Sequence, residues 1–242
     1  MRHWNIAAAQ VASVPDNVHH NIENHLRFVE CAALNGVELL VFPEYSLTGL
    51  PGEDYRPTPQ NPLSLIPLQL AAQRHEMTIV AGLPIAQADG LKISSGAVCF
   101  MPDGGRLQCS RTHNPGGYAQ PGLPIAGHKG QRFSLDFDST HDSEYFPSHE
   151  ASYGADLHAS GLVTSELKWP LASHWLQAWA RKYNMAVLMA NHTASSGNNR
   201  PVGRSSCWDE HGQLVMRGDE GELLVIGRRR NEGWQGEVVP LR

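Results

Sequence analysis

The sequence predicts a layered α/β protein with a mixed β-sheet, and three observations carry this expectation. Short apolar runs rich in β-prone residues, such as residues 37–42 and 185–191, are typical of strands buried on both faces. Between such runs, apolar side chains recur three and four positions apart, which indicates amphipathic helices. The segment Pro102-Asp103-Gly104-Gly105 has the residues of a tight turn and predicts a hairpin. Strands that alternate with helices and hairpins form sheets covered by helices.

The N-terminal region shows how each element is assigned. Residues 5–10 are short and apolar and are expected to form the first strand. A helix follows over residues 18–33, where apolar side chains repeat with helical spacing. Asp16 or Asn17 can cap the start of this helix, and Gly36 supplies its stop. The next strand therefore begins directly after Gly36.

The other elements follow from the same periodicities and from the turn residues between them. Further strands are expected at residues 37–42, 77–84, 95–101, 106–112, 133–138, 155–162, 185–191 and 222–226, and residues 205–215 are expected to form short strands with a turn at 210–212. Further helices are expected at residues 63–75, 144–153 and 173–183, the last one capped by Ser173. The sequence contains no internal repeat, low-complexity segment or convincing linker, so residues 1–242 are expected to form a single domain.

Composition and charge exclude several classes of partner. Hydrophobic residues make up 41% and charged residues 18% of the chain, and the net charge is −5, which is ordinary for a soluble globular protein. No basic stripe could neutralise phosphates, so neither nucleic acid nor a membrane surface is expected as a partner. The one basic run, Arg228 to Arg230, is expected to be a solvated surface. The apolar stretch near the N-terminus is too short for a signal peptide, which predicts a cytoplasmic protein.

The four cysteines are scattered along the chain without the C-x-x-C spacing of zinc or redox sites. In a chain of this length a disulfide framework is also unexpected. Each is therefore predicted to be a buried free thiol. No cofactor is expected.

Glu44 is the first candidate for a functional residue. It follows the apolar run 37–42 and Pro43, so it lies at the mouth of a buried strand. A carboxylate held there by rigid backbone is suited to taking up and releasing protons. The alternative is a solvated or capping glutamate at a junction between strand and loop.

An ordered series of segments along nearly the whole chain resembles the nitrilase, or carbon-nitrogen hydrolase, superfamily. The match lies in order and spacing as well as in single motifs. The segments are NIAAAQ at 5–10, FPEYSLTG at 42–49, GLPI at 82–85, CFMPDGGRLQCSRTH at 99–113, GADLHASG at 154–161, ARKYNMAVLMANH at 180–192 and VGRSSCWDEHGQL at 202–214.

The resemblance implies a catalytic triad that this chain does not keep. In the family a glutamate acts as general base, a cysteine attacks an amide or nitrile carbon, and a lysine stabilises the tetrahedral intermediate. Glu44 matches the glutamate, but Arg111 stands where the lysine is expected and Asp136 stands where the cysteine is expected. The family's second glutamate has no counterpart in residues 114–122. Four further side chains are expected around a bound ligand: His113, Tyr118, Asp138 and His141.

The two substitutions remove the family's chemistry and favour a salt bridge. A carboxylate such as Asp136 is a weak nucleophile toward an amide, and the anhydride that it would form reverts. The planar guanidinium of Arg111 matches a carboxylate in bidentate fashion, unlike the compact charge of lysine. Among the cysteines, Cys207 is the least unsuitable substitute, although it belongs to the C-terminal hairpin.

Three hypotheses follow for the function. The chain could be a nitrilase-like protein that has lost cysteine chemistry and serves as a ligand-binding or assembly protein. It could still hydrolyse amide or nitrile carbon-nitrogen bonds by general-base activation of water through Glu44, Asp136 and His141. It could instead hold a metal ion with a set of four side chains: Glu44, Asp136, Asp138 and His141. His141 could equally be a solvated loop residue.

The resemblance also implies a fold and an assembly. The expected fold is a four-layer α-β-β-α sandwich with two mixed β-sheets and the site at the strand ends. A homodimer is expected, packed through the helices at 144–153 and 173–183, and the aromatic side chains Trp175 and Trp179 are compatible with burial in such an interface. An amide-like small molecule is the expected ligand.

Overall fold

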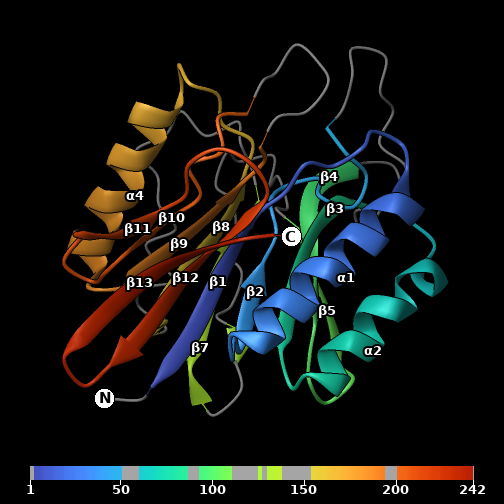
Figure 1. The fold of residues 1–242 in the computed structure, drawn as a ribbon, viewed down its shortest axis with the longest axis horizontal. Coiled ribbons are helices and arrows are strands. Elements are labelled where there is room, and N and C mark those ends of the chain that lie inside the picture. Colours follow the sequence, from blue (N-terminus) through green and yellow to red (C-terminus); the bar gives the residue numbers. More distant parts are fainter. Residues whose placement is uncertain are drawn as a thin grey trace, which may run out of the picture.

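The computed structural model describes residues 3–50, 60–86, 93–110, 125–126, 130–137, 154–193 and 201–241, and within them it contains two β-sheets (Figure 1). The first sheet has the strand order β13-β12-β1-β2-β3-β4-β5, and the second has the order β11-β10-β9-β8-β7-β6. The strands are β1 (Trp4–Gln10), β2 (Leu39–Val41), β3 (Thr78–Ala86), β4 (Ile93–Phe100), β5 (Arg106–Ser110), β6 (Ile125–Ala126), β7 (Arg132–Asp136), β8 (Leu157–Leu162), β9 (Ala186–Asn191), β10 (Ser206–Trp208), β11 (Leu214–Arg217), β12 (Leu223–Arg230) and β13 (Gly233–Pro240).

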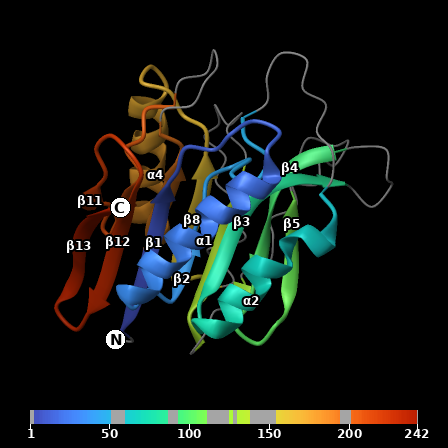
Figure 2. The ribbon, with the colours of Figure 1, turned by 45° about the vertical axis from the view of Figure 1, so that its right-hand side comes forward.

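Helices cover the outer faces of both sheets (Figures 1 and 2). They are α1 (Val18–Leu34), the short 3-10 turn η1 (Pro62–Leu65), α2 (Ile66–Arg74) and α4 (Trp169–Tyr183). One apolar cluster lies between α1, α2 and the first sheet, a second lies between the two sheets, and a third lies between the second sheet and α4. The protein is therefore a four-layer α-β-β-α sandwich, as expected.

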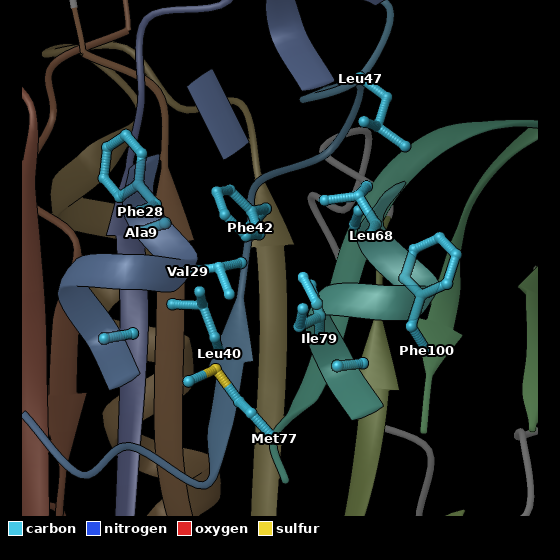
Figure 3. Packing of buried hydrophobic residues seen from close by; sticks show 14 of the residues in the cluster. Ala9, Phe28, Val29, Leu40, Phe42, Leu47, Leu68, Met77, Ile79 and Phe100 are labelled. Atoms are coloured by element: carbon cyan, nitrogen blue, oxygen red, sulfur yellow. The ribbon is translucent and has the colours of Figure 1, made fainter. Parts of the chain in front are cut away.

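The core beneath α1 shows why the apolar runs become strands. Leu40 and Phe42 point from β2 and its end toward Phe28 and Val29 of α1, and all four side chains are fully buried (Figure 3). Each buried side chain of this size stabilises the fold by about 1.5–3 kcal/mol. The run is continuously apolar because its strand is covered on both faces.

The start of α1 confirms the predicted cap. The side chain of Asn17 accepts a hydrogen bond of 3.1 Å from the backbone N–H of His20, one of the donors that the first helical turn leaves unsatisfied. The chain leaves the helix through Gly36, whose φ of +64° lies in the left-handed region. Local residue chemistry thus determines both ends of the helix.

Both sheets contain three parallel strands, and these run in the same direction. In the first sheet β1, β2 and β3 are parallel, and in the second β7, β8 and β9 are parallel. Val11 and His192, the residues that follow β1 and β9, form an isolated parallel bridge, and the N–H of Thr193 donates to the carbonyl of Val11 at 3.1 Å. The six strands therefore end on one side of the sandwich, called here the carboxyl edge.

Two sequence predictions need correction. The last strand is predicted at residues 222–226, but β12 continues through Arg230 and pairs with β13, a strand that was not predicted. These arginines are not simply solvated: Arg229 makes a 3.0 Å ion pair with Glu210, with both side chains less than one-fifth exposed, and Arg228 makes a 3.0 Å ion pair with Glu237. The basic run is thus neutralised by acids from neighbouring segments.

Helix α4 begins earlier than predicted. It starts at Trp169, with Lys168 at the cap position, and Ser173 lies inside the helix with its hydroxyl donating to the carbonyl of Pro170 at 3.0 Å. Pro170 fits the first turn because the missing N–H of proline would have no partner there. The helix expected at 144–153 lies outside the described residues. None of the helices that the structure describes is both long and apolar enough to cross a membrane.

Candidate functional site

Two of the predicted site residues, Glu44 and Asp136, lie at the carboxyl edge. Glu44 follows the end of β2, and Asp136 is the last residue of β7. Strand β2 packs against β8, the neighbour of β7, so the two carboxylates come from facing sheets. The other five predicted site residues lie outside the described residues: Arg111, His113, Tyr118, Asp138 and His141.

The segment that carries Glu44, residues 42–49, is called the acid segment and forms a series of tight turns. The N–H of Ser46 donates to the carbonyl of Pro43 at 3.2 Å, and the N–H of Gly49 donates to that of Tyr45 at 2.8 Å. Glu44 is 4% exposed. Tyr45 has a φ of +57°, in the left-handed region that residues other than glycine rarely adopt. The contacts around this segment must therefore hold it in a demanding conformation.

Strand β3 supplies the first of these contacts through Gly82. The N–H of Leu47 donates to the carbonyl of Gly82 at 3.0 Å, and the N–H of Gly82 donates to the hydroxyl of Ser46 at 3.1 Å. A Cβ atom at Gly82 would lie 2.2 Å from the carbonyl oxygen of Pro43 and 2.8 Å from the Cα of Glu44. The acid segment can approach the strand this closely only because residue 82 is glycine.

Helix α1 supplies the second group of contacts. The side-chain amide of Asn21 donates to the carbonyl of Leu47 at 3.0 Å, and His25, one turn later, places its Nε2 3.0 Å from the hydroxyl of Ser46. The ring of His25 also stacks on Phe42, with 3.9 Å between the ring centroids. The buried face of the helix is thus polar where it meets the acid segment.

The hydrogen bonds assign the protons of His25. Its Nδ1 lies 2.6 Å from the carbonyl oxygen of Asn21, which can only accept, so Nδ1 carries the proton. Nε2 then accepts from the hydroxyl of Ser46, and that hydroxyl accepts from the N–H of Gly82. Burial lowers the pKa of His25 to about 3, so the ring is neutral at physiological pH.

A second buried histidine contacts the acid segment from the other sheet. His192, which follows β9, donates a hydrogen bond of 2.7 Å from Nε2 to the backbone carbonyl of Glu44. Burial lowers the pKa of His192 to about 4. Two neutral histidines, His25 and His192, therefore flank the acid segment.

The surroundings of Asp136 are also rigid. Phe133 of β7 lies in the core between the sheets, so the alternation of side chains along the strand places Ser134 and Asp136 on the opposite face. Ser134 and His158 share a hydrogen bond of 2.9 Å on that face, and Asp136 is paired in register with Ser160 of β8. Asp136 therefore ends a partly buried, hydrogen-bonded strand.

A sequence profile of the carbon-nitrogen hydrolase family matches residues 5–137, which is more than half of the chain and includes both Glu44 and Asp136. The chain belongs to the carbon-nitrogen hydrolase family. Glu44 lies in the segment that corresponds to the family's glutamate by resemblance.

Solved structures of this superfamily have the same fold. Nit3 of Saccharomyces cerevisiae, a member of branch 10 of the nitrilase superfamily, is 20% identical with a TM-score of 0.78, and the match covers 96% of this chain and 92% of Nit3. A cysteine-to-alanine mutant of the amidase from Nesterenkonia sp. AN1, in complex with butyramide, is 20% identical with a TM-score of 0.74, covering 92% of this chain and 89% of the amidase. Glutamine-dependent NAD+ synthetase from Acinetobacter baumannii is 16% identical with a TM-score of 0.80, and the match covers 97% of this chain but 47% of the synthetase.

All four cysteines of this carbon-nitrogen hydrolase family member lie within the described residues. They belong to α1 (Cys31), β4 (Cys99), β5 (Cys109) and β10 (Cys207). Cys207 is fully buried between the sheets, and burial raises its pKa to about 12. A hydrogen bond with Cys109 and burial raise the pKa of Cys99 well above its ordinary value. Cys31 and Cys109 are only partly buried, so the prediction of four buried thiols is right for two of them.

The metal hypothesis stays a prediction. In the part of the chain that the structure describes, no three His, Cys, Asp or Glu side chains come together as metal ligands. Two of the four proposed ligands, Asp138 and His141, lie outside that part.

The polar residues that hold the acid segment are not among the residues predicted from the sequence. Their signal was present in α1, where Asn21 and His25 are polar at a spacing of four residues on the face that the apolar pattern turns inward. Buried polar side chains on such a face require hydrogen-bond partners inside the protein. His192 carried no comparable signal, because its partner Glu44 is 148 residues away.

Proposed function

We propose that this protein is a carbon-nitrogen hydrolase family member that binds a small ligand or a protein partner without cysteine-dependent hydrolysis. One observation carries the proposal: none of its four cysteines ends or directly follows a parallel strand, while Asp136 ends β7 where the resemblance assigns the nucleophile. A glutamate-to-glutamine mutant of the amidase from Nesterenkonia sp. AN1, which has this fold, shows covalent addition of the acetamide moiety of fluoroacetamide at its active-site cysteine.

Thiol chemistry supports the same conclusion. The attacking species in such reactions is the thiolate, which requires a pKa near or below the working pH. Cys207 is the least unsuitable substitute by sequence, but its pKa of about 12 keeps it protonated. Its burial between the sheets also separates its sulfur from any ligand in solution.

The retained parts of the site favour binding. Glu44 is held by a preorganised acid segment, so its carboxylate would be presented to a ligand without large rearrangement. A salt bridge between Arg111 and Asp136 would replace the cation and thiolate of the family. The proposed ligand is a small amide or a related molecule. Its N–H group can donate a hydrogen bond to the carboxylate of Glu44.

The proposal includes a homodimer packed through α4. Leu167 and Leu171, just before and within the first turn of α4, are 89% and 49% exposed, which is compatible with an apolar contact. Trp179 belongs to the core of its own chain and is 8% exposed, so it would support the helix from beneath and contribute little contact area. Analytical ultracentrifugation of wild type and Leu171→Glu tests this part: the variant is expected to sediment as a monomer, and an unchanged dimer would contradict this interface.

The hydrolytic test measures ammonia release from butyramide, acrylamide and glutamine. Wild type is expected to release no more ammonia than the matched Glu44→Gln variant. Turnover by wild type that Glu44→Gln abolishes would overturn the proposal in favour of hydrolysis through Glu44 and Asp136. The double variant Arg111→Lys with Asp136→Cys restores the family's residue types and is expected to gain measurable amidase or esterase turnover.

Binding and metal content are tested separately. Isothermal titration of butyramide into wild type is expected to give a saturable heat that Glu44→Gln weakens. The absence of binding by every amide tested would leave assembly as the function. A stoichiometric metal ion in the purified protein, found by elemental analysis and lost in Asp136→Asn, would favour the metal hypothesis instead.

A further inference from the structure

His192 connects the second sheet to the acid segment of the first. Its ring Nε2 lies 2.7 Å from the backbone carbonyl oxygen of Glu44, and both residues are buried. The backbone of His192 is fixed in turn, because its carbonyl accepts a 3.0 Å hydrogen bond from the N–H of Gly203 and because the residue is bridged to Val11. The ring therefore projects from a rigid support.

The proton on this ring is assigned by its partner. A backbone carbonyl can only accept, so Nε2 carries the proton. Within the described part of the chain, Nδ1 of His192 is buried without a hydrogen-bond partner. The ring's hydrogen bond in this part of the chain is to the carbonyl of Glu44, and the backbone of Val11 also interacts with the ring. His25 is the neighbouring titratable ring, and a charge on His192 would lower the pKa of His25.

The conformation after Glu44 needs an external support. Tyr45 has a φ of +57°, and a non-glycine residue held there is strained by about 1–3 kcal/mol. The later part of the acid segment is tied down by Ser46, Leu47 and Gly49 through their own hydrogen bonds. The peptide plane between Glu44 and Tyr45 turns its carbonyl toward His192. Loss of that one bond would allow this plane to rotate while the later turns persist.

We propose that His192 is the positioning residue for Glu44. Its neutral Nε2–H fixes the peptide plane that follows Glu44, and through that plane it fixes the direction of the Glu44 carboxylate at the carboxyl edge. The inference rests on the proposed function only for the use of the carboxylate, which is contact with a ligand. The positioning itself belongs to the resting protein.

The test compares two amide side chains at position 192. In His192→Gln the terminal nitrogen can reach the position of Nε2, whereas in His192→Asn it reaches only the position of Nδ1. The readout is the midpoint of the Glu44 carboxyl titration, followed by the 13Cδ resonance in protein labelled at glutamate and assigned with Glu44→Gln. His192→Gln is expected to keep the wild-type midpoint, and His192→Asn is expected to shift it by about half a unit, a factor of about three in the ionisation constant.

A matched control separates positioning from general loss of packing. His158 is equally buried, but it makes its hydrogen bond to Ser134 on the face of the second sheet that packs against Trp179 of α4. His158→Gln is expected to leave the Glu44 midpoint unchanged. Equal Glu44 titration curves for His192→Gln and His192→Asn would overturn the proposal. A shift of the Glu44 midpoint in His158→Gln as large as that in His192→Asn would also overturn it.

The wild-type protein provides a test that needs no substitution. At pH 6 the 15N resonances of His192 are expected to show a protonated Nε2 and an unprotonated Nδ1, and the reverse tautomer would overturn the proposal. None of these measurements uses a ligand or a substrate. Detection of amide hydrolysis would therefore overturn the non-hydrolytic function and leave the positioning role standing. An unchanged Glu44 midpoint in His192→Asn would overturn the positioning role and leave the non-hydrolytic function standing.

Discussion

Acidification from pH 7 to pH 5 is expected to weaken the fold through two buried histidines, His25 and His192. Both are fully buried and neutral, with pKa values lowered to about 3 and about 4. In the unfolded chain each imidazole has a pKa of about 6.5 and takes up a proton as the pH falls through that value. Because the unfolded state then binds more protons than the folded state, the free energy of unfolding falls as the pH falls.

The magnitude follows from this difference in proton uptake. At pH 5 an unfolded histidine is almost fully protonated and a folded one is not, so each residue removes about 2 kcal/mol of stability relative to pH 7. The loss depends little on the exact folded pKa, provided that it lies well below 5. The folded protein also takes up these protons below about pH 4 at His192 and below about pH 3 at His25, where each contribution levels off. Together the two rings account for about 4 kcal/mol between pH 7 and pH 5, a large share of the stability of a typical domain.

Urea unfolding of His25→Gln at both pH values measures one of these contributions. The variant is expected to lose about 2 kcal/mol less than wild type between pH 7 and pH 5. His19→Gln is the matched control, because the side chain of His19 is 88% exposed, and it is expected to lose as much as wild type. An equal loss in wild type and His25→Gln would refute the argument from burial.

Three further substitutions test other contacts. Gly82→Ala forces a Cβ onto the backbone of the acid segment and is expected to lower the free energy of unfolding by about 2–3 kcal/mol. Gly105→Ala is the control, because its Cβ would come within 3.4 Å only of a side-chain carboxylate oxygen. It is expected to change the free energy of unfolding by less than about 1 kcal/mol. Glu210→Gln removes the negative charge opposite the largely buried Arg229 and is expected to destabilise by about 1–3 kcal/mol, more than Glu237→Gln, whose side chain is half exposed. Asn17→Ala removes the cap of α1 and is expected to lower the free energy of unfolding by about 1 kcal/mol, measured by thermal unfolding. An unchanged unfolding temperature would show that the cap hydrogen bond contributes nothing.

Features that depend on neighbouring residues could be predicted from the sequence. The cap at Asn17, the turn after Phe100 and the apolar strands follow from side chains a few positions apart, and the structure confirms them. The placement of Glu44 at a strand end follows in the same way, because Pro43 ends an apolar run. These are local decisions in which residue chemistry and final structure agree.

Features that depend on contacts between distant segments could not be predicted. The bond from His192 to Glu44 spans two sheets, and the ion pair of Arg229 with Glu210 exists only once β12 packs beside the turn after β10. The early start of α4 reflects Pro170, whose favourable place in a first turn competes with the cap at Ser173. The family resemblance added the prediction of the four-layer fold, and it assigned Glu44 and Asp136 to the candidate site. The expected roles of the remaining site residues stay predictions.

The most direct measurement of the central claim is the intact mass of the protein after incubation with fluoroacetamide at neutral pH. We expect wild type to gain no acetamide group, because none of its cysteines ends a parallel strand, and we expect Asp136→Cys to gain one group at position 136. A stoichiometric acetamide addition to a cysteine of wild type would show that the protein retains cysteine chemistry and would contradict the account.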